Sequence, residues 1–266
     1  MVSIVSSLPK TTMLMLVSLI FSFPVLAGHL DIIQNNHELK ICYWPDYFGI
    51  SYRNPKTLEL SGIDIDMGRA LAADLHVSPR FVESSFPDLV ADLNHDRCDI
   101  AMFAIGVTQD RIEKIRFSSP YIQSDIYAIA SKTNPRIKKW SDIDQNDTIV
   151  AVAKGTLHEQ VMRAKLKKAS LLVLDTPFAR EQEVQSGRAD VFMTDYPYSR
   201  RFLANTDWGK LIAPDGIFHV TPYAYAMKKG DDAWYQRVQS FVSDIKKDGR
   251  LMQAATKQHL ESIVVQ

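Results

Sequence analysis

The sequence predicts an α/β fold in which mostly parallel sheets are flanked by helices. From residue 39 onward, short apolar runs alternate with stretches of helical period, and several of these runs end in polar turns that open the next helix. This alternation is typical of parallel sheets, because each parallel connection has to cross back over the sheet. The 266 residues, 46% apolar and 23% charged, suffice for one or two domains with hydrophobic cores.

The first series of elements lies between residues 39 and 121. It consists of a predicted strand at 39–43, helices at 66–75 and 87–95, and a strand at 98–104. This last strand runs directly into the polar turn 106–111, which opens a short helix. Ligands bind at such strand ends in open α/β sheets, so the turn is a candidate site.

The second series repeats the scheme with its own core. Its predicted strands are 125–130, 148–153, 171–174 and 190–193, and its predicted helices are 157–169 and 177–186. Gly187 ends the second helix, as glycine commonly does. Apolar segments at 211–213 and 223–227 follow, and then helices at 232–247 and 251–260.

The first 27 residues are typical of a secretory signal. Lys10 is their only charge, the apolar run 13–21 follows it, and Pro24 and small residues lead to a predicted cleavage after Ala27. A membrane anchor is the alternative, but the apolar run is shorter than the roughly 20 residues of a spanning helix. Residue 28 is glycine rather than cysteine, so we expect an exported, periplasmic product without a lipid anchor.

The charge balance excludes two classes of partner. The chain has 31 basic and 31 acidic side chains, which gives no basic excess for nucleic acid or an anionic membrane. We therefore expect neither partner.

Two cysteines, Cys42 and Cys98, lie in segments that are predicted to be buried strands. Were these strands parallel neighbours, Cys42 would lie late in one and Cys98 at the start of the other, about 10 Å apart at 3.3 Å per residue. That distance is too long for a disulfide. The sequence favours two free buried thiols.

Common catalytic and metal-binding motifs are absent from the sequence. It contains no H-E-x-x-H, G-x-S-x-G, P-loop or G-x-G-x-x-G motif. The seven histidines show no ligand spacing. We expect neither a metal nor a cofactor.

Three segments, 60–67, 99–121 and 187–195, together resemble the family 3 extracellular solute-binding proteins, the periplasmic amino-acid receptors of ABC importers. Their order and spacing fit the family over residues 38–260. The resemblance implies a two-lobed, type II periplasmic-binding-protein fold with two hinge crossings, near 121–125 and 220–223, that closes over a ligand. Lobe one would comprise residues 28–122 and 223–266, and lobe two residues 123–222.

The resemblance also implies two charged ligand contacts. Arg111 is similar to the arginine that holds the ligand's α-carboxylate, for which the planar guanidinium is well suited. Asp195 is similar to the acid that accepts from the α-ammonium. The alternatives are a surface salt bridge for Arg111 and a helix cap for Asp195.

The implied pocket wall includes Trp44, Tyr47 and Phe86, with Thr156 as a donor to the carboxylate. Core packing is the alternative for Trp44 and Phe86. Many amino-acid binders have Ser or Thr where this chain has residues 104–106, Ala-Ile-Gly. Only main-chain groups are then available around Gly106, and one hydroxyl hydrogen bond to the carboxylate is missing.

The side chain of the ligand is less well determined by the resemblance. Trp44 stands where binders of basic amino acids and glutamine have an aspartate, although Asp46 is close by. This favours an uncharged or aromatic ligand and leaves a cationic one open through Asp46.

The expected function is capture of a small zwitterion, an amino acid or a similar compound, by a monomeric receptor that delivers it to the membrane permease of an ABC importer. One alternative is an enzyme of the same fold, similar to cyclohexadienyl dehydratase, with Asp195 or Glu181 as its acid. The other is a periplasmic ligand sensor. Fold resemblance cannot by itself decide among these functions.

Overall fold

The computed structural model describes residues 2, 28–176 and 178–266. Apart from Val2, the predicted signal segment lies outside the described residues, as does Pro177. Nothing in the structure therefore bears on the predicted cleavage after Ala27.

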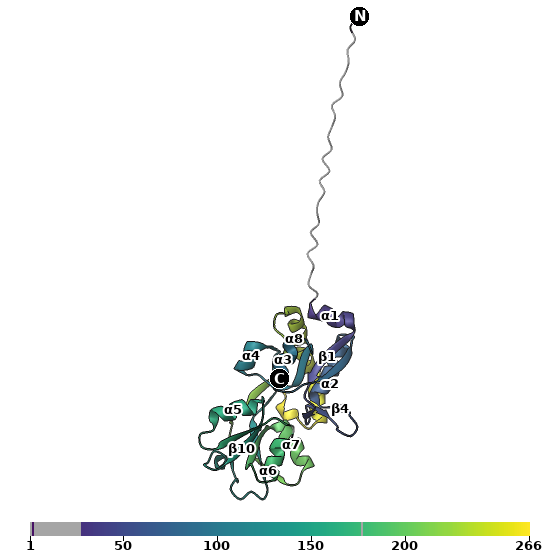
Figure 1. Cartoon of the computed structure of the whole chain (residues 1–266). Helices are drawn as coiled ribbons and strands as arrows, with labels where there is room; N and C mark the ends of the chain where they lie inside the picture. Colours follow the sequence, from purple (N-terminus) through teal and green to yellow (C-terminus); the bar gives the residue numbers. More distant parts are fainter. Residues whose placement is uncertain (1, 3–27, 177) are drawn as a thin grey trace.

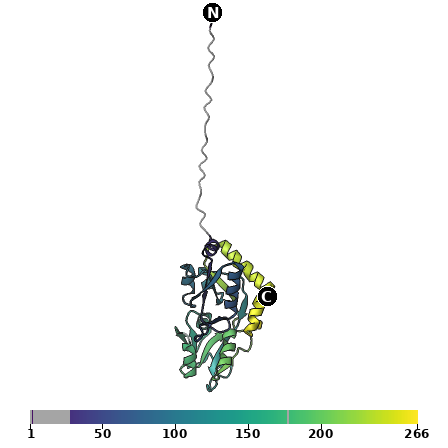
Figure 2. The same cartoon turned by 90° about the vertical axis from the view of Figure 1, so that its right-hand side faces the viewer.

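The first sheet lies mainly in the N-terminal part of the chain. Its strand order is β5 (Ser78–Glu83), β1 (Glu38–Tyr43), β6 (Ile100–Gly106), β14 (Thr221–Met227) and β7 (Arg116–Phe117), with β8 (Ile122–Ser124) paired to β14. Around it lie α1 (His29–Asn36), α2 (Ile63–Asp74), α3 (Leu89–Asn94), α4 (Gln109–Lys114), α8 (Asp232–Lys247) and α9 (Arg250–Lys257). A small antiparallel sheet of β2 (Asp46–Tyr47), β3 (Ser51–Arg53) and β4 (Leu60–Ser61) connects β1 to α2. Figure 2 shows the C-terminal helices, in yellow, along one side of this half.

The second sheet is formed by the middle of the chain. Its order is β11 (Ser170–Leu174), β10 (Ile149–Ala153), β12 (Val191–Asp195), β9 (Ile126–Ser131) and β13 (Gly209–Ile212). The helices are α5 (Leu157–Lys165), α6 (Ala179–Gln185) and α7 (Tyr196–Asn205), with single 3-10 turns at Trp140–Asp142 and, near the C-terminus, at Glu261–Ile263. Figure 1 shows this group of elements below the group that contains β1, α2 and α3.

Each sheet is mixed, with three parallel strands and antiparallel strands beside them. In the first sheet β14 is antiparallel to β6, β7 and β8, and in the second β9 is antiparallel to β12 and β13. Strands β9 and β14 are those by which the chain enters a sheet from the other one. A strand that enters in this way need not follow the direction that crossover helices impose on the other strands.

The chain crosses between the sheets twice, and the two crossing segments are paired. β8 and β14 form an antiparallel ladder in which Ser124 lies opposite Thr221 and Ile122 opposite Tyr223. Between β8 and β9, the Asp125 carboxylate accepts from the main-chain N–H groups of Phe218 and His219 (2.8 and 2.7 Å). The crossings therefore lie where the sequence predicts hinges, while the exact lobe limits stay a prediction.

Helix α2 begins at Ile63, three residues before the predicted start at Asp66. Gly62 precedes it with φ at 127°, a conformation that a residue with a side chain rarely adopts. A Cβ at this position would collide with the carbonyl of Ile50. The glycine therefore permits a tight entry into the helix.

The prediction of free thiols is wrong, because Cys42 and Cys98 form a disulfide with a Cα–Cα distance of 5.6 Å. Strand β6 begins at Ile100, so Cys98 lies in the bend before the strand. The predicted separation of the cysteines treated Cys98 as the first residue of an extended strand. The main-chain N–H of Asp99 donates to the carbonyl of Lys40 (2.9 Å) and draws this bend against β1. Exported proteins are the class in which such bridges persist.

The apolar core covers both faces of the first sheet. One cluster contains the disulfide with Leu89, Leu93 and Phe103, and Trp44 and Phe86 pack against it. A larger cluster extends through both sheets. Within the described part of the chain, no helix is both long and apolar enough to cross a membrane.

Candidate functional site

Arg111 is buried at the start of α4, directly after β6. Thr108 caps this helix by accepting from the Arg111 main-chain N–H (3.4 Å). The side chain is 6% exposed, and its guanidinium donates to the carbonyls of Gly106 and Gly155 (both 2.9 Å). Burial lowers the pKa of Arg111 to about 10, so the group keeps its positive charge at neutral pH.

The bond to Gly155 links the two halves of the molecule, since Gly155 precedes α5 in the second half. Gly155 has φ at +71°, and a Cβ there would lie 2.8 Å from the main-chain nitrogen of Pro87 in the first half. Glycine is therefore required at this close approach. Among the described residues, Arg111 forms no ion pair with a carboxylate.

Asp195 is buried at the opposite side of the cleft, at the end of β12. It is 1% exposed and caps α7 by accepting from the Tyr198 main-chain N–H (3.1 Å). Its other oxygen accepts from the hydroxyls of Tyr223 (2.9 Å) and Tyr47. Burial raises the pKa of Asp195, although these hydrogen bonds oppose the shift. In the described structure its donors are all neutral, and it has no cation within ion-pair distance.

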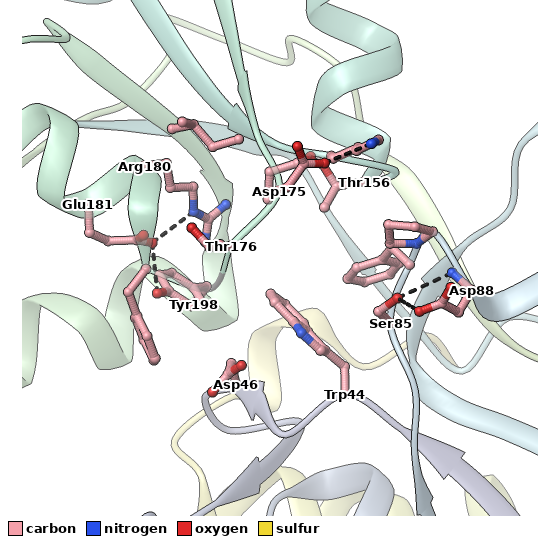
Figure 3. Close-up of a pocket in the computed structure, with 16 residues that line it drawn as sticks. Trp44, Asp46, Ser85, Asp88, Thr156, Asp175, Thr176, Arg180, Glu181 and Tyr198 are labelled. Carbon is pink, nitrogen blue, oxygen red and sulfur yellow. Dashed lines mark hydrogen bonds and ion pairs between the residues drawn. The ribbon is translucent and has the colours of Figure 1, made fainter.

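Two adjoining cavities lie between the halves. The larger has a volume of about 310 Å³ and the narrower one about 20 Å³, which is room for a single water molecule. They share the wall residues Trp44, Phe86, Thr156, Arg180 and Tyr198. Figure 3 shows the larger cavity, with Trp44 and Asp46 on one side and Arg180, Glu181 and Tyr198 facing them.

The structure brings most of the predicted residues together at these cavities. Trp44, Phe86 and Thr156 line both of them, while Tyr47, Gly106 and Asp195 line the narrower one. Arg111 lines neither, but its guanidinium bonds to Gly106 and lies 5.5 Å from the centre of the Phe86 ring. The rings of Trp44 and Phe86 are 5.2 Å apart. Trp44 and Phe86 also pack against the apolar core, so each of them both lines the cavities and contributes to core packing.

Sequence reasoning did not place Arg180 and Tyr198 in the site, and considered Glu181 only as an acid for the enzymatic alternative. Arg180 donates to Glu181 (2.7 Å) and to the carbonyl of Met193 (2.9 Å), and the Tyr198 hydroxyl donates to the same Glu181 oxygen (2.8 Å). The second oxygen, Oε2, is buried and has no partner in the described chain. These residues follow the end of β11 or β12, so the strand-end rule that selected Arg111 could also have indicated them.

Asp46 also lines the larger cavity, beside Trp44. Its carboxylate forms no side-chain hydrogen bond or ion pair with the residues described. Burial raises the pKa of Asp46; Arg53 opposes this shift, whereas the carboxylates of Glu83 and Glu181 add to it. The charged residues of this cavity are four acids, Asp46, Asp88, Asp175 and Glu181, against the two bases Lys154 and Arg180.

A buried carboxylate, Asp64, supports the floor of the narrower cavity from below. It is 0% exposed and accepts from the Ala104 main-chain N–H (2.7 Å) and the Tyr121 hydroxyl (2.6 Å). Ala104 lines the narrower cavity and has a φ of 50°, which is unusual for a residue with a side chain. Asp64 therefore holds the bent stretch of β6 that leads to Gly106.

Burial raises the pKa of Asp64 to about 7, against its usual value of 3.8. Between these values the folded state binds more protons than the unfolded state, so the free energy of unfolding falls as pH rises through this window. We expect Asp64→Asn to remove this component, up to about 1.4 kcal/mol per pH unit. Urea unfolding of both proteins at pH 5, 6 and 7 measures the difference, and parallel pH profiles would contradict the prediction.

Comparison with known proteins identifies relatives over most of the chain. Residues 39–260 match the bacterial extracellular solute-binding proteins, family 3. The cyclohexadienyl dehydratase of Pseudomonas aeruginosa is 31% identical over 229 residues, which cover 85% of this chain and 84% of that protein. An ABC transporter glutamine-binding protein of Bacillus subtilis is 26% identical over 225 residues, covering 83% and 81%.

Solved structures agree with this comparison. Two structures of an ancestral amino acid-binding protein, a precursor of cyclohexadienyl dehydratase that is also described as a cationic amino acid solute-binding protein, are each 30% identical to this chain. Each covers 86% of this chain and 98% of its own, with TM-scores of 0.78 and 0.68. The predicted two-lobed α/β fold is thereby confirmed.

Proposed function

Because the chain belongs to the bacterial extracellular solute-binding proteins of family 3, we propose that it captures an amino acid between its two halves for an ABC importer, without chemical conversion. One observation carries this proposal: Arg111 and Asp195, of opposite charge, are both buried, and neither forms an ion pair in the described chain. In a family of extracellular receptors, export through residues 1–27 and delivery to a permease are parts of the same proposal.

Buried charges are normally paired, because removal from water disfavours an isolated ion by several kcal/mol or more. A zwitterion supplies both missing partners. Its carboxylate would pair with Arg111, which uses only two of its five N–H donors in the bonds to Gly106 and Gly155. Its ammonium would pair with Asp195. A carboxylate has about four acceptor positions, and three donors already bond to Asp195, so one position remains for the ammonium.

Contacts between the halves support closure around such a ligand. Arg111 reaches Gly155 across the cleft, and Tyr47 of β2 reaches Asp195 of β12. A ligand that bonds to Arg111 and Asp195 together stabilises the arrangement in which these groups approach each other, and so shifts the population toward the closed form.

The side chain of the ligand is proposed to be cationic. The larger cavity has an excess of two acidic residues, and Asp46 has no partner there. The aromatic ring of Trp44 lies beside it, and aromatic faces attract cations. The relative described as a cationic amino acid solute-binding protein is consistent with this ligand class. L-arginine is accordingly the first compound to test.

We expect Asp46→Asn to lower the affinity for L-arginine by about 5- to 30-fold, the effect of a partly exposed charge pair worth about 1 to 2 kcal/mol. Affinity for L-citrulline, a zwitterion whose side chain has a similar shape but no charge, should be unchanged. Isothermal calorimetry with both compounds measures this. Asp88→Asn is the matched control, because Asp88 lines the same cavity but is bonded to Ser85 (2.6 Å). Equal losses for both compounds would contradict a charge interaction.

A thermal-shift screen against the twenty common L-amino acids tests the proposal as a whole. A ligand present at a thousand times its dissociation constant stabilises the folded protein by about 4 kcal/mol, a shift of several degrees. We expect the largest shifts from L-arginine or L-lysine. If no amino acid raises the melting temperature, the proposed function is wrong.

A second candidate function is a dehydratase, which the unpaired Glu181 Oε2 specifically favours. An acid at this position in the larger cavity could protonate the hydroxyl that leaves a cyclic substrate such as prephenate, while the substrate also loses carbon dioxide. Incubation with prephenate or L-arogenate, with detection of phenylpyruvate or phenylalanine, distinguishes the two functions. We expect no turnover. Turnover by the native chain that is lost in Glu181→Gln would replace the receptor function with an enzymatic one.

A further inference from the structure

His158 is a buried histidine in the narrower cavity whose ring has no hydrogen-bond partner. It lies in the first turn of α5, two residues after the cap Thr156. The residue is 8% exposed, and neither Nδ1 nor Nε2 has a partner in the described chain. A buried imidazole N–H without a partner costs about 1 to 3 kcal/mol, so this arrangement calls for an explanation.

The buried side-chain atoms without a hydrogen-bond partner in the described structure form two sets, one of which includes His158. Asp64 Oδ1 and the Tyr225 hydroxyl form the other set, and these two residues interact with each other. His158 and Glu181 are the remaining ones within the described residues, and each lines one of the two cavities of the cleft. Their free polar atoms therefore mark positions where polar ligand atoms can bind.

The ring of His158 is neutral at physiological pH. Burial, together with the nearby guanidinium groups of Arg180 and Arg111, lowers its pKa to about 3. The Thr194 main chain acts in the opposite direction without reaching hydrogen-bonding geometry. A neutral imidazole offers one N–H donor, and the nearby Arg111 guanidinium, which bonds only to carbonyls among the described residues, favours an anion.

The part of the same cavity that β6 forms lacks a side-chain donor. Ala104 and Gly106 line it, and neither has a hydroxyl. The Gly106 carbonyl is already bonded to Arg111 (2.9 Å). A carboxylate held by Arg111 beside these residues would thus receive no side-chain hydrogen bond from them, and His158 lines the same cavity from the second half.

We propose that His158 is a ligand-binding residue whose ring N–H donates to the ligand's carboxylate, in place of the hydroxyl that residues 104–106 do not provide. The assignment rests on the proposed capture of a carboxylate between the halves. It adds a contact from the second half to the one made by Arg111 from the first.

The test is calorimetry with L-arginine and with agmatine, which is arginine without its carboxylate. His158→Phe should weaken L-arginine binding by about 10- to 100-fold, the range for a hydrogen bond to a charged group, and leave agmatine binding unchanged. His158→Asn and His158→Gln place an amide N–H near Nδ1 and Nε2, respectively, and one of them should recover part of the loss. His219→Phe is the control, because His219 lines neither cavity.

Three results would overturn the assignment: unchanged L-arginine affinity in His158→Phe, equal losses for L-arginine and agmatine, or no recovery in either amide variant when all variants melt as cooperatively as the native chain.

Absence of L-arginine binding by the native chain would refute the proposed ligand class instead. The same comparison would then use prephenate, which has two carboxylates and no ammonium, and the other amino acids. A His158→Phe loss with any bound carboxylate supports the assignment, and binding of none of these compounds would overturn it together with the proposed function.

Discussion

Replacement of Arg111 by methionine is expected to weaken amino-acid binding by roughly 30-fold to several-thousand-fold. This is the range of about 2 to 5 kcal/mol for loss of one member of a desolvated charge pair. The melting temperature without ligand should change little. Hydrogen bonds to Gly106 and Gly155 are lost, but the cost of burying an unpaired cation is removed as well. Calorimetry and thermal unfolding of the same preparation measure both quantities.

Arg116→Met is the matched control for this variant. Arg116 also lies over an aromatic ring, that of Tyr235 at 3.5 Å, and pairs with Asp232, but it lines neither cavity of the cleft. We expect its affinity to equal that of the native chain. An affinity of Arg111→Met within threefold of the native value would show that Arg111 does not bind the carboxylate.

Asp195→Asn is expected to produce a loss of similar size through the opposite charge. Asparagine retains an oxygen that can cap α7, so the main change is loss of the negative charge that would face the ammonium. The loss should appear with L-arginine and be absent with 5-guanidinopentanoate, the analogue without an α-ammonium group. Calorimetry with the two compounds separates the ionic contact from a general disturbance of the site.

The raised pKa of Asp195 adds a pH dependence to the same contact. Protonation removes the charge that attracts the ammonium, so affinity in the native chain should decrease as pH falls through the pKa of Asp195. In Asp195→Asn this dependence should be lost. Asp175→Asn is the control, because Asp175 lines the larger cavity and already pairs with Lys154 (2.7 Å). Equal losses with L-arginine and 5-guanidinopentanoate would contradict the assignment.

Much of the fold could be predicted because strand and helix periods are local properties of the sequence. The strands ending at Gly106 and Asp195 were predicted to within two residues at their ends, and their position at the cleft follows from the general behaviour of α/β sheets. Strand direction was harder to predict. The antiparallel strands β9 and β14 depend on how the chain crosses between sheets, which no local pattern encodes.

The disulfide was missed for a related reason. Its formation depends on a bend at residues 97–99 that returns Cys98 to β1, and an apolar run gives no sign of where a strand begins within it. An error of two residues in the start of β6 was enough to turn a bonded pair into two distant thiols.

In the candidate site, the position of a residue after a strand indicated Arg111, Thr156 and Asp195. His158 also follows a strand, β10. Only its burial beside Arg180, Thr194 and Gly106 distinguishes it from an exposed helical histidine, and no local pattern gives that burial. Tyr223 was predicted only as part of a hinge, yet its hydroxyl bonds to Asp195.

The most direct measurement is a crystal structure of the chain with the amino acid that gives the largest shift in the screen. The account predicts one ligand touching both halves, with its carboxylate within hydrogen-bond distance of the Arg111 guanidinium and its ammonium within hydrogen-bond distance of the Asp195 carboxylate. A ligand that lies in the larger cavity with neither charged group bonded, while Arg111 still donates only to Gly106 and Gly155, would contradict it.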